Sequence, residues 1–149
     1  MATRSLIAIE HENGTVESIY CHSDGTPGVN GKILLEHYDT RKRVKELTAL
    51  GDLSAVEMRI VPNGKHTFLD REKGTCTAYH RDDNRPWEDH KPKVHESLDK
   101  FLSIDLIQME YIYVFTKEDI WTVYAKTFFG SLGERQILAD VLDRAKKAQ

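Results

Sequence analysis

The segment SLIAIEHENGTVESIYCH, residues 5–22, decides the fold. Two runs rich in apolar and β-branched residues, residues 6–9 and 15–21, flank the pair Asn13-Gly14. Because Asn-Gly tolerates the positive φ of a tight turn between antiparallel strands, the segment predicts a β-hairpin. Alternation along the second run separates two sets of side chains, Val16, Ser18 and Tyr20 on one side and Glu17, Ile19 and Cys21 on the other.

A second hairpin is predicted at EYIYVFTKEDIWTVYA, residues 110–125, around the polar turn 116–119. Its alternation places Tyr111, Tyr113 and Phe115 on one face and Ile112 and Val114 on the other. Since both sets are apolar or aromatic, we expect both faces of the sheet to be covered. A covered sheet argues against a base-stacking surface for nucleic acid.

Helical patterns lie between and after the hairpins. Residues 33–50 have helical spacing that is interrupted by the N-capping pair Asp39-Thr40 and ends before Gly51, so two helices or one kinked helix are expected. Helices are also predicted over residues 94–104 and in the tail 133–149. Strands are predicted within residues 55–61 and 75–80, and an exposed loop over residues 81–93. The fold class is therefore a single α+β domain over residues 1–149, a mostly antiparallel sheet built from hairpins with helices packed on one face.

Composition sets the broad class. The 149 residues correspond to about one domain. The net charge of −3 provides no global basic field to recruit nucleic acid. Two cysteines, Cys21 and Cys76, do not form a disulfide framework. No apolar run approaches the length of a membrane span, and residues 1–14 lack the apolar core of a signal peptide, so we expect a cytoplasmic protein without membrane association.

The glycine loop HSDGTPGVNGK, residues 22–32, lies between a predicted strand and a predicted helix. Such a loop directs backbone N–H groups towards an anion. The predicted ligand-binding residues are accordingly Gly25, Gly28, Gly31 and Lys32, together with Arg81. The loop is not a P-loop, because five residues separate Gly25 from Gly31 and Ile33 replaces the Ser or Thr that contacts magnesium. A purely structural need for positive φ remains an open interpretation.

Two polar corners share one format, an aromatic residue, a histidine, and an aspartate two positions after the histidine. The first corner holds His22 and Asp24, and the second holds His80 and Asp82. If the preceding strands end at one sheet edge, these four candidate catalytic residues converge as general acids and bases or around a divalent metal. Two solvated strand ends are the alternative. No metal-binding spacing such as CxxC or HExxH is present, so no metal and no cofactor are predicted.

The segment TRKRVKEL, residues 40–47, offers a third candidate. Arg41, Lys42, Arg43 and Lys45 would contact phosphates if this helix bound nucleic acid. The mixture with Glu46 and the surrounding hairpins favour a solvated helix face. Nucleic acid is therefore not the expected partner.

The pattern H.DG, LL.HY, V..L...GD.S and YHRD resembles a family of small, largely uncharacterised proteins of bacteriophage and prophage genomes. The matching positions are Tyr20, His22, Asp24, Gly25, Gly31, Leu34, Leu35, His37, Tyr38, Val44, Leu47, Gly51, Asp52, Ser54, Tyr79, His80, Arg81 and Asp82. They cover roughly the first half of the chain. GTPGVNG, residues 25–31, stands where relatives tend to carry an aromatic–proline–acidic run, so a shared ligand contact is not implied.

The resemblance implies a viral origin and a small accessory protein of the kind that blocks host defence or transcription machinery. We therefore hypothesise a phage-type protein that binds a host protein or a small anionic ligand in the host cytoplasm, with a role in host takeover or anti-defence and without catalysis. One alternative is a small hydrolase or nucleotide-processing enzyme that uses the His/Asp cluster beside the glycine loop. The second alternative is nucleic-acid binding through residues 41–45. The sequence defines no oligomeric state.

Overall fold

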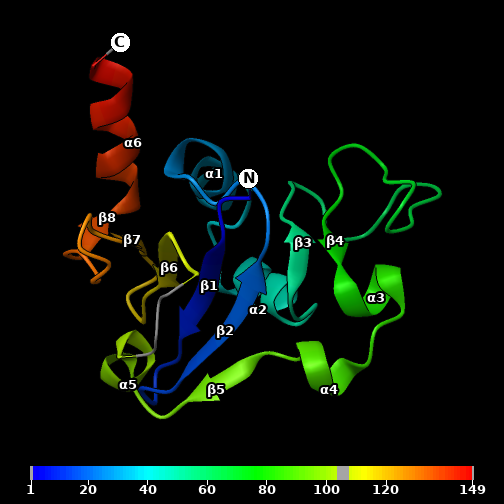
Figure 1. Cartoon of the computed structure of the whole chain (residues 1–149), viewed down its shortest axis with the longest axis horizontal. Helices are drawn as coiled ribbons and strands as arrows, with labels where there is room; N and C mark the ends of the chain where they lie inside the picture. The colour runs from blue at the N-terminus through cyan, green and yellow to red at the C-terminus, as the bar shows by residue number, and fades with distance from the viewer. Residues whose placement is uncertain (1, 104–107, 149) are drawn as a thin grey trace.

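The computed structural model describes residues 2–103 and 108–148, and eight strands within these ranges form one sheet. The strands are β1 (Ser5–Glu10), β2 (Val16–Cys21), β3 (Leu53–Ala55), β4 (Thr77–Ala78), β5 (Lys93–His95), β6 (Tyr111–Phe115), β7 (Trp121–Ala125) and β8 (Gln136–Ile137). Their order is β4-β3-β2-β1-β6-β7-β8, and β5 pairs with β2. Most pairs are antiparallel, whereas β1–β6 and β2–β3 are parallel. The predicted α+β class is confirmed (Figure 1).

Both predicted hairpins are present at the centre of the sheet. β1 pairs with β2 from Ser5 opposite Cys21 to Glu10 opposite Val16, and Gly14 adopts the positive φ of 91° that the turn requires. β6 pairs with β7 in the same antiparallel way. The parallel pairing of β1 with β6 joins the two hairpins. Local turn and alternation signals therefore determined the four central strands.

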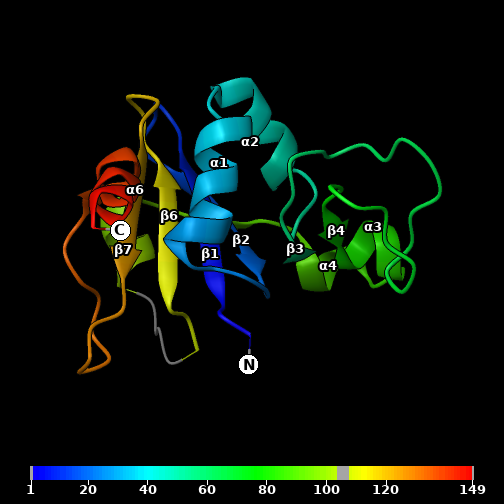
Figure 2. The ribbon, with the colours of Figure 1, turned by 90° about the horizontal axis from the view of Figure 1, so that it is seen from above.

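Apolar residues cover both faces of these strands, as their alternation predicts. Ile7, Ile9, Tyr113 and Phe115 belong to the first buried cluster. α1 (Lys32–His37), α2 (Arg41–Thr48) and α6 (Leu138–Lys147) contribute to that cluster (Figure 2). The second cluster contains Leu6, Ala8, Ile112 and Val114, and it is covered by Phe101 of α5 (Leu98–Leu102). The expectation that helices pack on only one face was wrong. The apolar side chains on the second face also have to be buried, and α5 covers them.

α1 and α2 are separated at the predicted N-cap of α2. Thr40 accepts a hydrogen bond from the Arg43 N–H at 3.2 Å, which starts α2. Gly51 follows α2 with φ of 77°, and a Cβ there would lie 2.3 Å from the His90 carbonyl oxygen. Two separate helices are confirmed. A π-helical turn, Pro27–Gly31, precedes α1.

An outer lobe, residues 52–95, extends the sheet beyond β2. It contains β3, β4, β5, α3 (Tyr79–Asp83) and α4 (Trp87–His90). The strand predicted in residues 55–61 was wrong beyond Ala55, and the strand predicted in residues 75–80 ends at Ala78. Asp82 Oδ2 accepts a hydrogen bond from the Ala78 N–H at 2.8 Å, which favours a helical turn directly after β4.

The rest of the lobe also departs from the sequence expectation. Residues 81–93 include the end of α3, all of α4 and the first residue of β5 rather than one loop. Of the helix predicted over residues 94–104, residues 94–103 include the rest of β5 and all of α5, and residue 104 lies outside the described residues. Residues 60–74 form a long connection that we call the Ω-loop, because its two ends meet. Arg59 N–H donates to the Gly74 carbonyl at 3.0 Å, and Cys76 N–H donates to the Arg59 carbonyl at 2.8 Å.

Within the ranges that the structure describes, no helix has both the length and the apolar character needed to span a bilayer.

Candidate functional site

A cleft of about 590 Å³ lies between the start of the glycine loop and the Ω-loop. Three segments form its walls: residues 23–24, the end of β3 with the residues that follow it, and the end of the Ω-loop with Thr75 and Thr77. These segments are far apart in sequence. β3 brings them together, because it pairs with the end of β2 on one side and with β4 on the other.

One wall of the cleft carries two carboxylates, Asp24 and Glu57. Asp24 is exposed and has φ of 58°, in the left-handed region. Burial raises the pKa of Glu57, and the nearby charge of Asp24 raises it further. Among the described residues, neither carboxylate has a hydrogen-bond or ion-pair partner. This wall therefore has unneutralised negative charge that favours a cation.

The Ω-loop contributes two basic residues to the lining, Arg71 and Lys73, with Glu72 between them. Arg71 is held by three contacts: its Nη2 donates to Ser54 Oγ at 3.1 Å, its Nε donates to the Phe68 carbonyl at 2.8 Å, and its guanidinium carbon lies 4.7 Å from the Phe68 ring centroid. Lys73 lies on the same segment and is exposed. The cleft thus presents charges of both signs across a small space.

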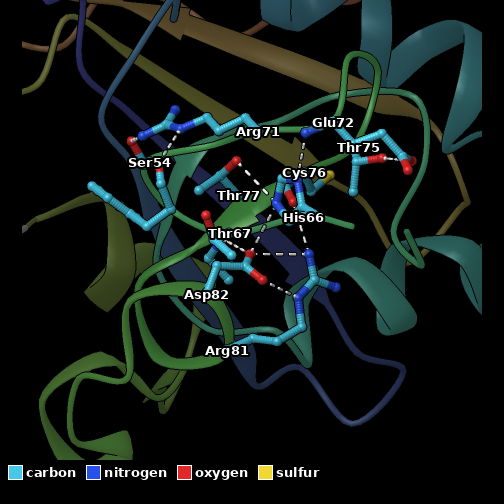
Figure 3. Close-up of polar contacts among 12 residues, drawn as sticks. Ser54, His66, Thr67, Arg71, Glu72, Thr75, Cys76, Thr77, Arg81 and Asp82 are labelled. Carbon is cyan, nitrogen blue, oxygen red and sulfur yellow. Dashed lines mark hydrogen bonds and ion pairs between the residues drawn. The ribbon is translucent and has the colours of Figure 1, made fainter. Parts of the chain in front are cut away.

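Next to Arg71, His66 connects the Ω-loop to β4 and α3 (Figure 3). The His66 side chain is completely buried, and the Glu72 N–H donates to its Nδ1 at 2.9 Å. Since Nδ1 accepts, the proton of the neutral ring is on Nε2. Nε2 lies 3.4 Å from Asp82 Oδ2 and 3.4 Å from Thr77 Oγ1.

This arrangement does not transfer protons to a substrate. A catalytic histidine uses one ring nitrogen for the reacting group and the other for an orienting carboxylate. In His66 the carboxylate and the hydroxyl meet the same nitrogen, while a backbone N–H occupies the other. His66 is therefore a structural clasp that holds the cleft wall.

Glu72 is the second polar anchor of the Ω-loop. Its carboxylate accepts hydrogen bonds from Asn63 N–H at 2.9 Å, Gly64 N–H at 2.6 Å, Thr75 Oγ1 at 2.7 Å and Arg59 Nη2 at 3.0 Å. These donors, with the Asn63 N–H first, lower the pKa of Glu72 to about 2. The Ω-loop has no regular secondary structure, and the hydrogen bonds to the Glu72 carboxylate hold its backbone in place.

The structure does not bring the two predicted histidine corners together. Cys21 of β2, Leu53 of β3 and Ala78 of β4 lie level with one another. β2 is parallel to β3 and β4 is antiparallel to it, so the chain leaves β2 and β4 in opposite directions. His22 N–H accordingly donates to the Leu53 carbonyl, whereas Tyr79 N–H donates to the carbonyl of Asp52.

Each histidine of these corners has its own local partner. The Tyr20 hydroxyl lies 2.7 Å from His22 Nδ1. His80 Nδ1 lies 2.7 Å from the Arg85 carbonyl oxygen, and the His80 ring packs against the edge of Trp87. Of the four predicted catalytic residues, Asp24 lines the cleft and Asp82 binds His66 behind it.

The predicted ligand-binding residues are mostly engaged in packing. A Cβ at Gly25 would lie 2.7 Å from the Thr3 carbonyl oxygen, and one at Gly31 would lie 3.0 Å from Leu138 Cδ1. Loop N–H groups bond internally, for example Asn30 N–H to the Asp24 carbonyl at 3.1 Å. The close approach of neighbouring atoms therefore explains why glycine occupies positions 25 and 31. Gly28 and Lys32 instead line a separate groove between α1 and α6.

The predicted cations Arg81, Arg41 and Arg43 also have internal partners. Arg81 donates to the carbonyls of Ile60 and Cys76 at 2.6 and 2.7 Å and pairs with Asp82. Arg41 pairs with Asp119 at 2.8 Å, and Arg43 lies 4.8 Å from the Tyr38 ring centroid. These guanidinium groups hold the fold together.

Sequence reasoning missed Glu57, Arg71, Lys73 and His66. Glu57 fell inside a predicted strand and was read as part of it, whereas His66, Arg71 and Lys73 lie in a segment without helical or strand periodicity, so no pattern pointed to a site. The signal that was present is the length of the polar stretch between β3 and β4. Long loops in small domains are usually either disordered or functional.

No protein-family model matches the chain, and comparisons with curated proteins and with solved structures also find no match. In the part of the chain that the structure describes, no three His, Cys, Asp or Glu side chains are grouped to hold a metal ion.

Proposed function

We propose that the protein is a non-catalytic binding protein whose cleft takes a small zwitterionic ligand, such as a basic amino acid. The observation that carries this proposal is the Asp24–Glu57 carboxylate pair, which faces the cleft without a counterion. A cation placed between the carboxylates removes their mutual repulsion. Arg71 and Lys73, which also line the cleft, supply the complement for a ligand carboxylate.

The proposed ligand carries a cationic group, whereas the glycine loop predicted an anionic ligand. That loop uses its N–H groups internally, so the charge of the site comes from the side chains that line the cleft. The phage origin and the anti-defence role remain proposals that rest on the resemblance of residues 18–54 and 78–82. Capture of a basic metabolite by such an accessory protein is consistent with a role that needs no catalysis.

Isothermal titration calorimetry with L-arginine, L-lysine and L-ornithine tests the proposal. We expect saturable binding that is lost in Asp24→Asn and weakened at least tenfold in Glu57→Gln, because both variants remove charge that faces the ligand. Agmatine, which lacks the carboxylate, should bind more weakly than arginine. Glu88→Gln is the matched control, since Glu88 is a largely exposed carboxylate on α4 outside the cleft. Absence of binding of all three amino acids to the wild type would refute the proposal.

A hydrolase remains the second candidate because of one observation, the raised pKa of Glu57 beside Asp24. A carboxyl group with a raised pKa is suited to donate a proton to a leaving group. The test is turnover of chromogenic ester and glycoside substrates across pH. Activity that Glu57→Gln abolishes would favour this candidate, and inactivity of the wild type would leave the binding role.

A further inference from the structure

Main-chain contacts fix the positions of Asp24 and Glu57. The Glu57 N–H donates to Cys76 Sγ at 3.2 Å, and the Glu57 carbonyl accepts from the Tyr38 hydroxyl at 2.6 Å. The Asp24 carbonyl accepts from the Asn30 N–H at 3.1 Å, and Asp24 has φ of 58°. Cys76, Tyr38 and Asn30 are all buried. Moving the two carboxylates apart through the main chain would therefore break buried contacts.

The charged and titratable groups around Glu57 come from each element packed against it. Burial is the larger cause that raises the pKa of Glu57, and the charge of Asp24 in the glycine loop is the second. Burial also raises the pKa of Cys76 and of Tyr38, so both groups stay neutral. From α2, Arg43 donates to the carbonyl of the residue after Glu57 at 3.3 Å. The Ω-loop adds three charged residues to the cleft, Arg71, Glu72 and Lys73.

The cations among these groups do not neutralise Glu57. Arg71 is held by the three contacts described above, and Arg43 pairs with a glutamate of its own helix at 4.0 Å. Lys73 is exposed, and the pKa of Glu57 is raised although Lys73 lines the same cleft. The repulsion between Asp24 and Glu57 is therefore relieved by a proton or by a cation from outside the chain.

We propose that the cleft takes up the cationic group of its ligand in exchange for a proton on Glu57, so that the ligand is bound near neutral pH and released in acid. This exchange rests on the proposed function, because it needs a ligand whose cation lies between the two carboxylates. The O–H bond of the Glu57 carboxyl group breaks, its electron pair stays on the carboxylate oxygen, and the proton passes to solvent. One positive charge enters the site as another leaves, so the exchange needs no co-reactant.

The sign of the pH dependence follows from the direction of the Glu57 shift. Because the pKa of Glu57 is raised above 4.5, a neutral carboxyl group persists above that pH, and binding must remove its proton. Affinity should therefore increase as the pH rises above 4.5 and become constant once Glu57 is fully ionised. Opening of the Ω-loop does not account for weak binding in this range. The donors around Glu72, with the Asn63 N–H first, lower the pKa of Glu72 to about 2 and keep it ionised.

Isothermal titration calorimetry with L-arginine tests the exchange in pairs of buffers that differ in ionisation enthalpy. Cacodylate and MES serve at about pH 5.5, and phosphate and HEPES at about pH 7.5. We expect binding to be weaker at the lower pH by roughly threefold or more, since linkage to one proton changes affinity by up to about tenfold per pH unit. At the lower pH the binding enthalpy should differ between the two buffers, because the buffer takes up the released proton. At the higher pH it should not differ.

Glu57→Gln removes the titrating group and keeps the shape of the side chain. This variant should bind arginine more weakly than the wild type at neutral pH, with equal affinity at both pH values and no difference between buffers. Glu88→Gln is the matched control and should behave as the wild type, because Glu88 is a largely exposed carboxylate outside the cleft. Far-UV circular dichroism checks that both variants are folded at each pH.

Carbon-13 NMR of the glutamate carboxyl groups tests the exchange on the wild type alone. The glutamate that titrates at the highest pH should titrate at a lower pH once arginine is added. Equal affinities at the two pH values, with equal enthalpies within each buffer pair, would overturn the exchange and leave the proposed function standing. Proton release that persists in Glu57→Gln would overturn the assignment to Glu57. Absence of arginine binding at both pH values would refute the exchange and the proposed function together.

Discussion

The central hairpins and the Ω-loop are stabilised by different chemistry. In the hairpins, fully buried apolar side chains such as Ile7, Ile9 and Phe115 pack together, and each has many neighbours. In the Ω-loop, Val61 and Leu69 are 71% and 94% exposed, and buried polar groups hold the chain. Apolar packing is non-directional and shared among many contacts, whereas a polar clasp fails when one partner is lost.

The two regions should therefore differ in how they open. Loss of the hairpin core exposes the whole sheet, because β1 and β6 connect every other strand. The Ω-loop closes on itself through Arg59, Gly74 and Cys76. Such a closed segment can open locally at a lower free energy than global unfolding.

The largest effect is expected in the hairpin core. Phe115 is fully buried, and its ring centroid lies 5.2 Å from that of Trp121. Phe115→Ala should reduce the free energy of unfolding by about 3–5 kcal/mol through lost burial and the cavity that remains. Urea unfolding followed by far-UV circular dichroism measures this change. Phe128→Ala is the matched control, because Phe128 is 96% exposed, and a comparable loss there would contradict the comparison.

A smaller and local effect is expected at the clasp. His66→Ala leaves the Glu72 N–H without its acceptor, which costs about 1–3 kcal/mol. It also removes one neighbour of the buried Asp82 carboxylate, which keeps Ala78 N–H and Arg81. Hydrogen exchange should show faster amide exchange in residues 59–76 and unchanged exchange in β1 and β6. His66→Asn should restore part of the protection, since its side-chain oxygen can accept from Glu72 N–H. His22→Ala is the control, and equal loss of protection throughout the sheet in His66→Ala would argue against local opening.

These differences also explain what the sequence revealed. The hairpins follow from period-two alternation and from Asn13-Gly14, which are local signals that need no knowledge of distant residues. The Ω-loop depends on pairs such as His66 with Asp82 and Arg59 with Glu72, whose spacing follows no period. Sequence reasoning therefore obtained the central strands and α6, but it extended β3 and β4 too far.

For the same reason, only part of the candidate site could be predicted from the sequence. Asp24 was predicted as a member of a histidine–aspartate corner, and it lines the cleft without His80 or Asp82 beside it there. The convergence of His22 with His80 depended on the direction of β4 relative to β2, which the antiparallel pairing of β3 with β4 decides. Gly25 and Gly31 have packing reasons that become visible only with Thr3, Tyr113 and Leu138 beside them.

Acid should weaken the Ω-loop before it affects the hairpins. The donors around Glu72 lower its pKa from 4.5 to about 2, so the folded state favours the ionised carboxylate. This contribution to stability is fully present above pH 4.5 and is lost as the pH falls towards about 2. Protection of the Ω-loop amides in hydrogen exchange should fall over this window. Glu72→Gln should be less protected at neutral pH and should lack this pH dependence, with Glu88→Gln as the control. A wild-type loop whose protection is constant down to pH 2 would contradict the assignment.

The smallest perturbation uses the two native thiols as probes of opening. Burial raises the pKa of Cys21 to about 12 and also raises that of Cys76, so both are unreactive thiols in the folded protein. Cys76 lies at the closure of the Ω-loop, with Glu57 N–H 3.2 Å from its sulfur, whereas Cys21 lies in β2. Iodoacetamide labelling followed by peptide mass spectrometry should therefore modify Cys76 faster than Cys21, because local opening exposes only Cys76. His66→Ala should increase the rate at Cys76 and leave Cys21 unchanged. Equal rates at both cysteines would mean that the two regions open together, and the distinction between an apolar core and a polar clasp would then have no consequence for dynamics.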